Sequence, residues 1–540
     1  MLPSIPNPVD FDVSLTTGFV PDRLPLTKLS DSYFASWEFT ASILPFLIMT
    51  GKVRAVIDSS SSFPELNANR LANDRDQQRR AYSILGFIAH AYIWCGDAND
   101  NKNNKNGATA SDHLPVQIAN PLLQLSEWLE VPPLATYAGL CLWNHQPLLI
   151  NNDDDDGHEV DPSKLDLSSL ATLHTFTGSI DESWFYLVST VIEIKGAQCI
   201  THMLDAMHAC RRDLPHDVIV SLQSLAEKVD DLIPILTRLP EQCDPHTFYY
   251  RIRPFLAGSK NMADAGLPFG VRYGDQSNYR QYAGGSNAQS SLIQALDIGL
   301  GVRHRPTGVN NNNNDDDDDD YAKSNNFIHE MRQYMPGPHR RFLEHLELAA
   351  NIRDYVLDHQ RSNPALTLAY DACLAMLRSF RDKHIQIVSR YIIIPAKSRS
   401  ATSTITTNLS ATTTTTTTTS SSSKLQQQQQ QQQQPRQQLS STKKQGLANV
   451  SVNEKKLARG TGGTALIPFL KQARDETGEP AAGSWAARLL RDDAFYSQRS
   501  SQAGMNNANT TAGTVDDKEQ SVGLAGKWSV SDDYGGICHW

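Results

Sequence analysis

The segment from Ala365 to Tyr391 constrains the fold more than any other part of the sequence. Its apolar residues recur every three or four positions, at Leu366, Tyr370, Cys373, Leu377, Phe380, Ile387 and Tyr391. This is the period of one face of an α-helix, so the segment predicts a long helix with a buried stripe. Weaker stretches of the same period lie on both sides of it, and no stretch of useful length alternates apolar and polar residues as a strand does. The sequence therefore predicts an all-α fold.

Several other stretches share the helical period. The clearest are Asp74–Trp94, Asp181–Arg211, His216–Leu239, Gln289–Leu300 and Leu466–Arg474. An acidic insert interrupts the pattern near residue 153, and we expect a boundary between two helical domains near it. We predict an N-terminal arm at 1–30, a small helical domain at 31–175, a larger helical domain at 176–475 and a C-terminal extension, partly disordered, at 476–540.

Three low-complexity tracts interrupt these domains. They are the acidic insert at about 151–157, an Asn/Asp run at about 309–320 and a Ser/Thr/Gln-rich tract at about 398–445. Such compositions cannot bury enough apolar surface to offset the entropy of ordering, so we expect the tracts to be disordered. Roughly 440 residues remain without them, which is ample for a large core.

The net charge of −10 comes from the same inserts. Asp153–Asp156 and Asp315–Asp320 supply ten acidic residues, and without them 49 acids balance 49 Lys and Arg residues. A nearly neutral body lacks the basic stripe of a nucleic-acid-binding protein. It also lacks the basic cluster that binds a membrane surface.

The cysteines and the apolar runs predict a cytoplasmic protein. The seven cysteines are scattered and contain no CxxC pair, which excludes a disulfide framework or a zinc ribbon. The N-terminus has no signal-peptide pattern, and the longest apolar run, Ile43–Met49, is too short to span a bilayer. We expect a soluble monomer without nucleic-acid or membrane partners.

His384 lies in the apolar stripe of the long helix, between Phe380 and Ile387. A buried imidazole needs a partner. On the helix pattern alone, a core histidine that is hydrogen-bonded to a carbonyl or to water is the more common case. The alternative is an axial ligand of a haem iron, which needs a single neutral imidazole on a rigid helix. Arg381, one turn earlier, is suited to pair with a haem propionate or with a structural carboxylate.

Two other segments could contact a ligand. Phe248 and Tyr249 precede Arg253, and an arginine beside an aromatic wall suits an aromatic carboxylate ligand. Cation–π packing on a surface helix explains the same residues, and this segment alone favours it.

Gly460–Thr464 lacks the lysine of a phosphate-binding loop, so a flap that closes over a ligand and a plain linker are equally compatible with it.

Several segments together resemble the indoleamine 2,3-dioxygenase family. The most specific are SFRDKHIQIVSRYIIIPA (Ser379–Ala396), AGGSNAQSS (Ala283–Ser291), YMPGPHRRFLEHLE (Tyr334–Glu347) and GTGGT (Gly460–Thr464). Weaker matches are QLSEWLEVPPLATYA (Gln124–Ala138), WFYLVS (Trp184–Ser189) and RPFLAG (Arg253–Gly258). They occur in the family's order, from about residue 15 to about residue 475.

The resemblance implies an all-helical fold in which a small N-terminal domain roofs a larger domain that holds haem b. It makes His384 the axial ligand of the iron. The implied reaction inserts both atoms of O2 into the indole 2,3-bond of L-tryptophan and gives N-formylkynurenine, the first intermediate of the kynurenine pathway toward NAD. The implied partners are L-tryptophan or a related indoleamine, O2 and an electron donor that keeps the haem iron ferrous.

The resemblance also assigns residues to the substrate. Arg253 would hold the substrate carboxylate, and Thr461 of the flap would contact the ammonium group. Ser189 would lie near the indole NH, and these three residues are the expected catalytic set. The other expected substrate contacts are Tyr137, Leu140, Cys141, Phe185, Phe248, Tyr249, Gly284 and Ser286.

The haem contacts implied by the resemblance are His384, Arg381, Asp297 and Ser286. Asp297 and Arg381 would tune the axial histidine from the proximal side. The pattern also departs from the family, because Leu140 replaces a small cysteine of the pocket. The alternative to a dioxygenase is a non-catalytic haem protein that binds or senses O2 on the same fold. Arg253 and Thr461 favour the enzyme, since an oxygen store needs no carboxylate anchor.

Overall fold

The computed structural model describes residues 3–96, 110–148, 164–306, 327–397 and 466–491, and the backbone of four short strands at 450–452, 455–457, 520–523 and 526–529. Thr461 and all three low-complexity tracts lie outside the described residues. The described part is built mainly from helices, so the predicted all-α fold is confirmed. The strands are two to four residues long and serve as local pairs between loops.

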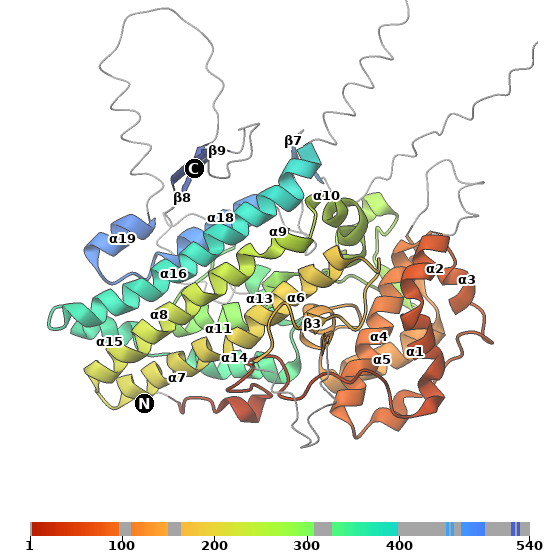
Figure 1. The fold of residues 1–540 in the computed structure, drawn as a ribbon, viewed down its shortest axis with the longest axis horizontal. Helices are drawn as coiled ribbons and strands as arrows, with labels where there is room; N and C mark the ends of the chain where they lie inside the picture. The colour runs from red at the N-terminus through yellow and green to blue at the C-terminus, as the bar shows by residue number, and fades with distance from the viewer. Residues whose placement is uncertain are drawn as a thin grey trace, which may run out of the picture.

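The first helices gather at one end of the molecule, drawn in red and orange in Figure 1. They are α1 (Ala35–Ser42), α2 (Leu44–Thr50), α3 (Val53–Ile57), α4 (Arg75–Trp94) and α5 (Val116–Leu129). α4 runs through their centre and is buried on almost all sides. The Asp74 side chain caps it by accepting hydrogen bonds from the backbone N–H groups of Asp76 and Gln77.

The later helices form the larger part of the molecule. They are α6 (Ile180–Lys195), α7 (Ala197–Arg211), α8 (Pro215–Thr237), α9 (Leu239–Gln242), α10 (Pro245–Thr247), α11 (Ser291–Gly299), α13 (Phe327–Arg332), α14 (Gly337–Ala349), α15 (Ile352–His359), α16 (Pro364–Val388), α18 (Leu466–Thr477) and α19 (Ser484–Arg491). α8 and α16 run side by side along the long axis and form the most extensive helix pair. α18 packs on α16, so the helix that follows the GTGGT segment lies beside the one that carries His384.

The predicted helix Asp181–Arg211 is two helices, α6 and α7, and this prediction was wrong in one detail. The break falls at Gly196, where an ideal Cβ would lie 2.1 Å from Cδ2 of Leu292. The missing side chain lets α11 pack directly against the chain between α6 and α7.

One of the short strand pairs, β1 with β4, joins distant parts of the chain, and the other pairs are local. β1 (His113–Leu114) pairs in parallel with β4 (Val271–Tyr273), which pairs in antiparallel fashion with β5 (Tyr279–Arg280). Antiparallel pairs are also formed by β2 (Gln146–Pro147) with β3 (Leu170–Ala171), β6 (Val450–Val452) with β7 (Lys455–Leu457), and β8 (Gln520–Gly523) with β9 (Gly526–Ser529).

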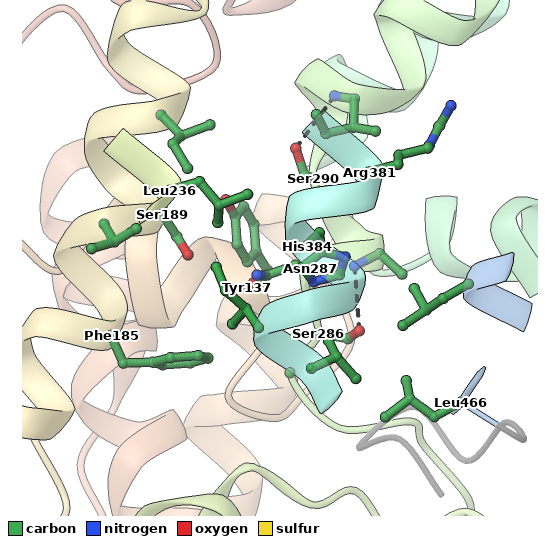
Figure 2. Close-up of a pocket in the computed structure, with 18 of the residues that line it drawn as sticks. Tyr137, Phe185, Ser189, Leu236, Ser286, Asn287, Ser290, Arg381, His384 and Leu466 are labelled. Carbon is green, nitrogen blue, oxygen red and sulfur yellow. Dashed lines mark hydrogen bonds between the residues drawn. The ribbon is translucent and has the colours of Figure 1, made fainter. Parts of the chain in front are cut away.

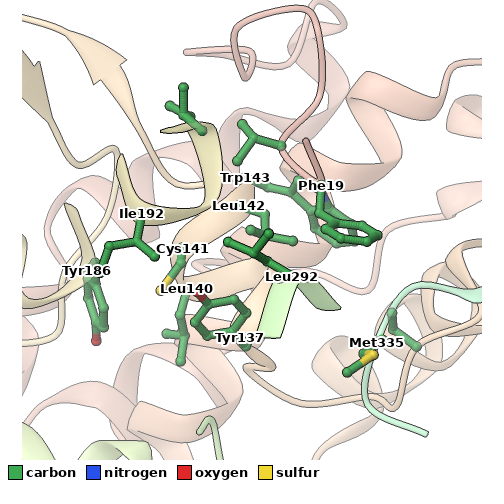
Figure 3. Packing of buried hydrophobic residues seen from close by; sticks show 14 of the residues in the cluster. Phe19, Tyr137, Leu140, Cys141, Leu142, Trp143, Tyr186, Ile192, Leu292 and Met335 are labelled. Atoms are coloured by element: carbon green, nitrogen blue, oxygen red, sulfur yellow. The ribbon is translucent and has the colours of Figure 1, made fainter. Parts of the chain in front are cut away.

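One contiguous core joins the N-terminal arm to both groups of helices. Figure 3 shows part of it, where Phe19 of the arm, Trp143, Ile192 of α6 and Leu292 of α11 gather. The ring of Phe19 also lies edge-on to Phe342 of α14, with 5.8 Å between the ring centroids. The arm is therefore a packed part of the fold. Within the described ranges, no helix is both long and apolar enough to cross a membrane.

Candidate active site

A cavity of about 240 Å³ lies between α6, α11, α16 and α18. Most of the residues that line it are apolar, and the polar ones are few. The wall includes these residues expected from the sequence: Tyr137, Leu140, Cys141, Phe185, Ser189, Phe248, Arg253, Ser286, Asp297, Arg381 and His384. Figure 2 shows Phe185 and Ser189 projecting from α6 toward α16, which carries His384. We call the His384 side proximal and the Phe185 side distal.

His384 faces this cavity from the long helix α16. Burial lowers the pKa of His384 to about 4, and the positive charge of Arg381 adds to this effect. The imidazole is therefore neutral at physiological pH and its nitrogen lone pair is available. In the part of the chain that the structure describes, no hydrogen bond is made to its ring. A neutral imidazole without a protein partner, in an apolar cavity, fits the axial position of a haem.

The described residues contain no group of three or more His, Cys, Asp and Glu side chains that could hold a metal ion by themselves. A single histidine is enough for a haem, because the porphyrin supplies the other four ligands. The donor set in the cavity therefore fits haem and does not fit a protein-only metal centre.

Charged groups connect the proximal wall to α18. The Arg381 guanidinium donates to both carboxylate oxygens of Asp297, at 2.8 and 2.7 Å. The His304 ring lies 3.0 Å from Asp297 Oδ2 and 2.6 Å from Glu476 Oε2. Burial alone would raise the pKa of Asp297, but the charges of Arg381 and His304 outweigh it and lower that pKa. The Asp297 carboxylate is therefore held in its ionised form between the Arg381 guanidinium and the His304 ring.

Arg253 supplies a buried cation to the wall. It begins the 3₁₀ turn Arg253–Leu256, its side chain is only 2% exposed, and it lines the cavity. Burial lowers the pKa of Arg253 to about 10, so the guanidinium stays charged at neutral pH. Phe248 and Phe185 stand on the same wall with 4.7 Å between their ring centroids. A cation next to an aromatic wall suits an aromatic ligand that carries a carboxylate.

Two residues expected at the substrate lie behind the wall instead. Tyr249 is buried with its ring against the guanidinium of Arg253, 5.5 Å from the ring centroid to the Arg253 carbon. Gly284 packs backbone to backbone, because an ideal Cβ there would lie 2.0 Å from the carbonyl oxygen of Leu256. The next residue, Gly285, is the one that reaches the cavity. The structure thus places Tyr249 and Gly284 as supports of Arg253 and of the 284–286 loop.

Thr461 of the predicted flap lies outside the described residues. The chain resumes at Leu466, which lines the cavity together with Phe469 and Leu470 of α18. The segment after the flap therefore forms part of the wall, where Figure 2 shows Leu466 at its edge.

Sequence reasoning missed two features of the site. Three π-helical turns, Ala138–Leu142, Phe248–Ile252 and Ser389–Ile393, each supply wall residues. Single π-turns are common at functional sites, but they have no simple sequence pattern. The second feature is the buried carboxyl of Glu193, one turn after Ser189 on α6. The four-residue spacing places both residues on one face of the helix, and this signal could have identified Glu193 from the sequence.

Comparisons with known proteins agree with this arrangement. The family model described as "Indoleamine 2,3-dioxygenase" matches residues 7–480. The chain is 43% identical to indoleamine 2,3-dioxygenase of Saccharomyces cerevisiae over 85% of this chain and 90% of that protein. It is 33% identical to 6-hydroxytryptophan 2,3-dioxygenase of Fusarium equiseti over 88% of this chain and 98% of that protein. It is also 29% identical to indoleamine 2,3-dioxygenase 1 of Mus musculus over 85% of this chain and 92% of that protein. The chain belongs to the indoleamine 2,3-dioxygenase family.

Proposed function

We propose that this protein is a haem-dependent dioxygenase that inserts both atoms of O2 into the indole 2,3-bond of L-tryptophan, giving N-formylkynurenine. One observation carries the proposal: a neutral histidine, whose ring has no hydrogen bond among the described residues, and a buried arginine line the same apolar cavity. The first suits a haem iron and the second suits the carboxylate of an amino acid.

His384 would hold haem b on the proximal side, with Asp297 and Arg381 next to it and Ser286 at the edge of the cavity. When bound, the ferrous haem supplies the oxygen chemistry, which amino-acid side chains cannot perform. An electron donor is needed to keep its iron in the ferrous state.

The distal residues would bind and orient the substrate. Arg253 would pair with the carboxylate, and Phe185 and Phe248 would pack on the indole ring. Ser189 is placed to accept or donate a hydrogen bond within the wall, and the apolar surroundings exclude water. Among the described residues of the wall, His384 is the only histidine, so the distal side offers no histidine as a general base. Catalysis here rests on placing the substrate next to the cofactor.

The substrate class is an indole that carries an amino-acid group. A relative is named for 6-hydroxytryptophan, so ring substituents are compatible with this scaffold in that protein. For this chain we propose L-tryptophan as the main substrate, because the wall around Phe185 is aromatic and aliphatic.

The test uses the purified full-length protein with its haem reduced. We expect a haem spectrum and turnover of L-tryptophan, measured by the absorbance of N-formylkynurenine. A haem spectrum without product from any indole would contradict the proposal and favour an oxygen-binding protein on the same fold.

A further inference from the structure

Glu193 is a buried carboxyl group directly behind the distal wall. It lies on α6, one turn after Ser189, and its side chain is 1% exposed. Its Oε1 atom accepts hydrogen bonds from the Tyr137 hydroxyl at 3.0 Å and from the Ser290 hydroxyl at 2.5 Å. Its Oε2 atom is also buried and has no hydrogen-bond partner within the described ranges. A buried oxygen without a partner is rare in native proteins and calls for an explanation.

Both donors of this network line the cavity. Tyr137 is held at two points, since its backbone N–H also donates to Gln289 Oε1 at 2.9 Å. Figure 2 shows Tyr137 next to the cavity between α6 and α16. The position of the Tyr137 ring on the wall is therefore set partly by Glu193.

The surroundings of Glu193 favour its neutral form. The titratable groups that face it come from the 137–142 turn and are Tyr137 and Cys141, and burial raises the pKa of both. From the residue that caps α11 it meets the Ser290 hydroxyl, and from the N-terminal arm it meets Gly18, where an ideal Cβ would lie 2.9 Å from the Glu193 carbonyl oxygen. Burial raises the pKa of Glu193 to about 7, and the hydrogen bonds from Ser290 and Tyr137 offset only part of this effect.

We propose that Glu193 is a positioning residue of the distal wall, which as a neutral carboxylic acid, with its proton on Oε2, holds the Tyr137 ring against the cavity. Ionisation would place a negative oxygen without a donor beside an apolar space, which is costly. The carboxylate would then draw in water or move, and Tyr137 would move with it. The kinetic part of this inference rests on the proposed function, but the protonation state of Glu193 can be measured without it.

The sign of the pH effect follows from the neutral form. The arrangement that holds the Tyr137 ring against the cavity is present below the pKa of Glu193 and changes as pH rises through it, because the ionised carboxylate accepts stronger hydrogen bonds from Tyr137 and Ser290 and draws them toward itself. We therefore expect kcat/KM for L-tryptophan to fall above the midpoint of the titration, by up to about tenfold per pH unit. Glu193→Gln keeps the acceptor oxygen and removes the titration, so it should abolish this decline while keeping the value seen at low pH.

The direct experiment is infrared difference spectroscopy of the full-length holoprotein, wild type minus Glu193→Gln, from pH 5.5 to about 9. We expect the C=O stretch of a protonated carboxyl group, lost with a midpoint near 7, and a matching decline of kcat/KM in wild type alone. Dividing the wild-type values by those of the variant removes the ionisation of the substrate.

Glu182 provides the matched control on the same helix. It is also fully buried, but Oε1 accepts from Phe176 N at 2.7 Å and Oε2 accepts from Thr177 N at 2.7 Å. It does not belong to the cavity wall. We expect Glu182→Gln to lower the melting temperature and to leave the shape of the pH profile unchanged.

Two results would overturn the inference. One is the absence of a protonated-carboxyl band at low pH, and the other is a wild-type pH profile that coincides with that of Glu193→Gln. If Glu193→Gln does not fold, the infrared titration is repeated with Tyr137→Phe. This variant removes one hydrogen bond that stabilises the ionised carboxylate, so the midpoint of the Glu193 titration should rise. An unchanged midpoint in Tyr137→Phe would contradict the proposed contact. Loss of turnover with the infrared titration intact would count against the proposed function and not against the role of Glu193.

Discussion

Arg253 is a buried cation on a largely apolar wall, and at the scale of single residues it defines the ligand most sharply. Hydrogen bonds to charged groups contribute about 1.5–3 kcal/mol, so Arg253→Ala should lower kcat/KM for L-tryptophan by about 10- to 150-fold. The haem spectrum should remain, because Arg253 belongs to the 253–256 turn and not to α16, which carries His384. Steady-state kinetics with tryptamine, which has no carboxylate, is the matched control.

For Arg253→Ala, the ratio of kcat/KM for L-tryptophan to that for tryptamine should collapse toward one. An equal loss with both substrates would show that Arg253 only supports the fold, through its contact with the Tyr249 ring.

Among the secondary-structure elements, a chain of hydrogen bonds connects α18, α11 and α16. His304 bonds to Glu476 of α18 and to Asp297 of α11, and Asp297 also accepts a hydrogen bond from Arg381 of α16. Burial alone would lower the pKa of His304, but its ion pair with Asp297 and its hydrogen bond to Glu476 outweigh this and raise it. Because the pKa of His304 is higher in the folded than in the unfolded protein, protonation of His304 stabilises the fold. This contribution is fully present below the unfolded-state pKa and is lost as pH rises through the folded-state pKa.

Removing one partner of a buried charged network costs about 3–5 kcal/mol. His304→Ala should therefore lower the melting temperature strongly at pH 6, and the difference from wild type should shrink toward pH 9. Melting temperatures of wild type and variant between pH 6 and about pH 9 measure the size of the loss and its dependence on pH. His359→Ala is the control, because His359 pairs with the exposed Asp213 and should change little. A difference that grows with pH would contradict a charged His304.

Local sequence patterns predicted the ranges of some helices well. Contacts between residues far apart in the sequence determine the helix break and the connections between helices. α4 and α16 follow from the helical period of their apolar residues, which a sequence displays directly. The break at Gly196 depends on Leu292, almost a hundred residues later, and no local pattern encodes it. The same holds for the link from His304 to Glu476, which spans 172 residues.

The site shows the same division. His384 and Arg253 stood out because their residue types are unusual in apolar or aromatic surroundings, and the family resemblance then gave each a role. The structure separates Phe248 on the wall from Tyr249 behind it, which spacing could not do, since the π-helical turn Phe248–Ile252 changes the direction of each side chain.

At the scale of the whole molecule, the described residues enclose the cavity without residues 398–444, which lie outside the described part. Deleting 398–444 shortens the connection from Lys397 to Leu466 about threefold, which changes the loop-closure free energy by only about 1 kcal/mol. We expect the deletion variant to keep the haem spectrum and nearly the same melting temperature. Loss of haem from this variant would show that the tract is structural.

We propose that His384 binds the iron of a haem in this cavity, since it is the only histidine among the described residues of the wall. The most direct test is the absorbance spectrum of the reduced, CO-treated protein, compared between wild type and His384→Ala. His345→Ala, an exposed histidine on α14, is the control. We predict a haem spectrum in wild type and His345→Ala and its loss or marked shift in His384→Ala. An identical spectrum in His384→Ala, or no haem in wild type, would contradict the account.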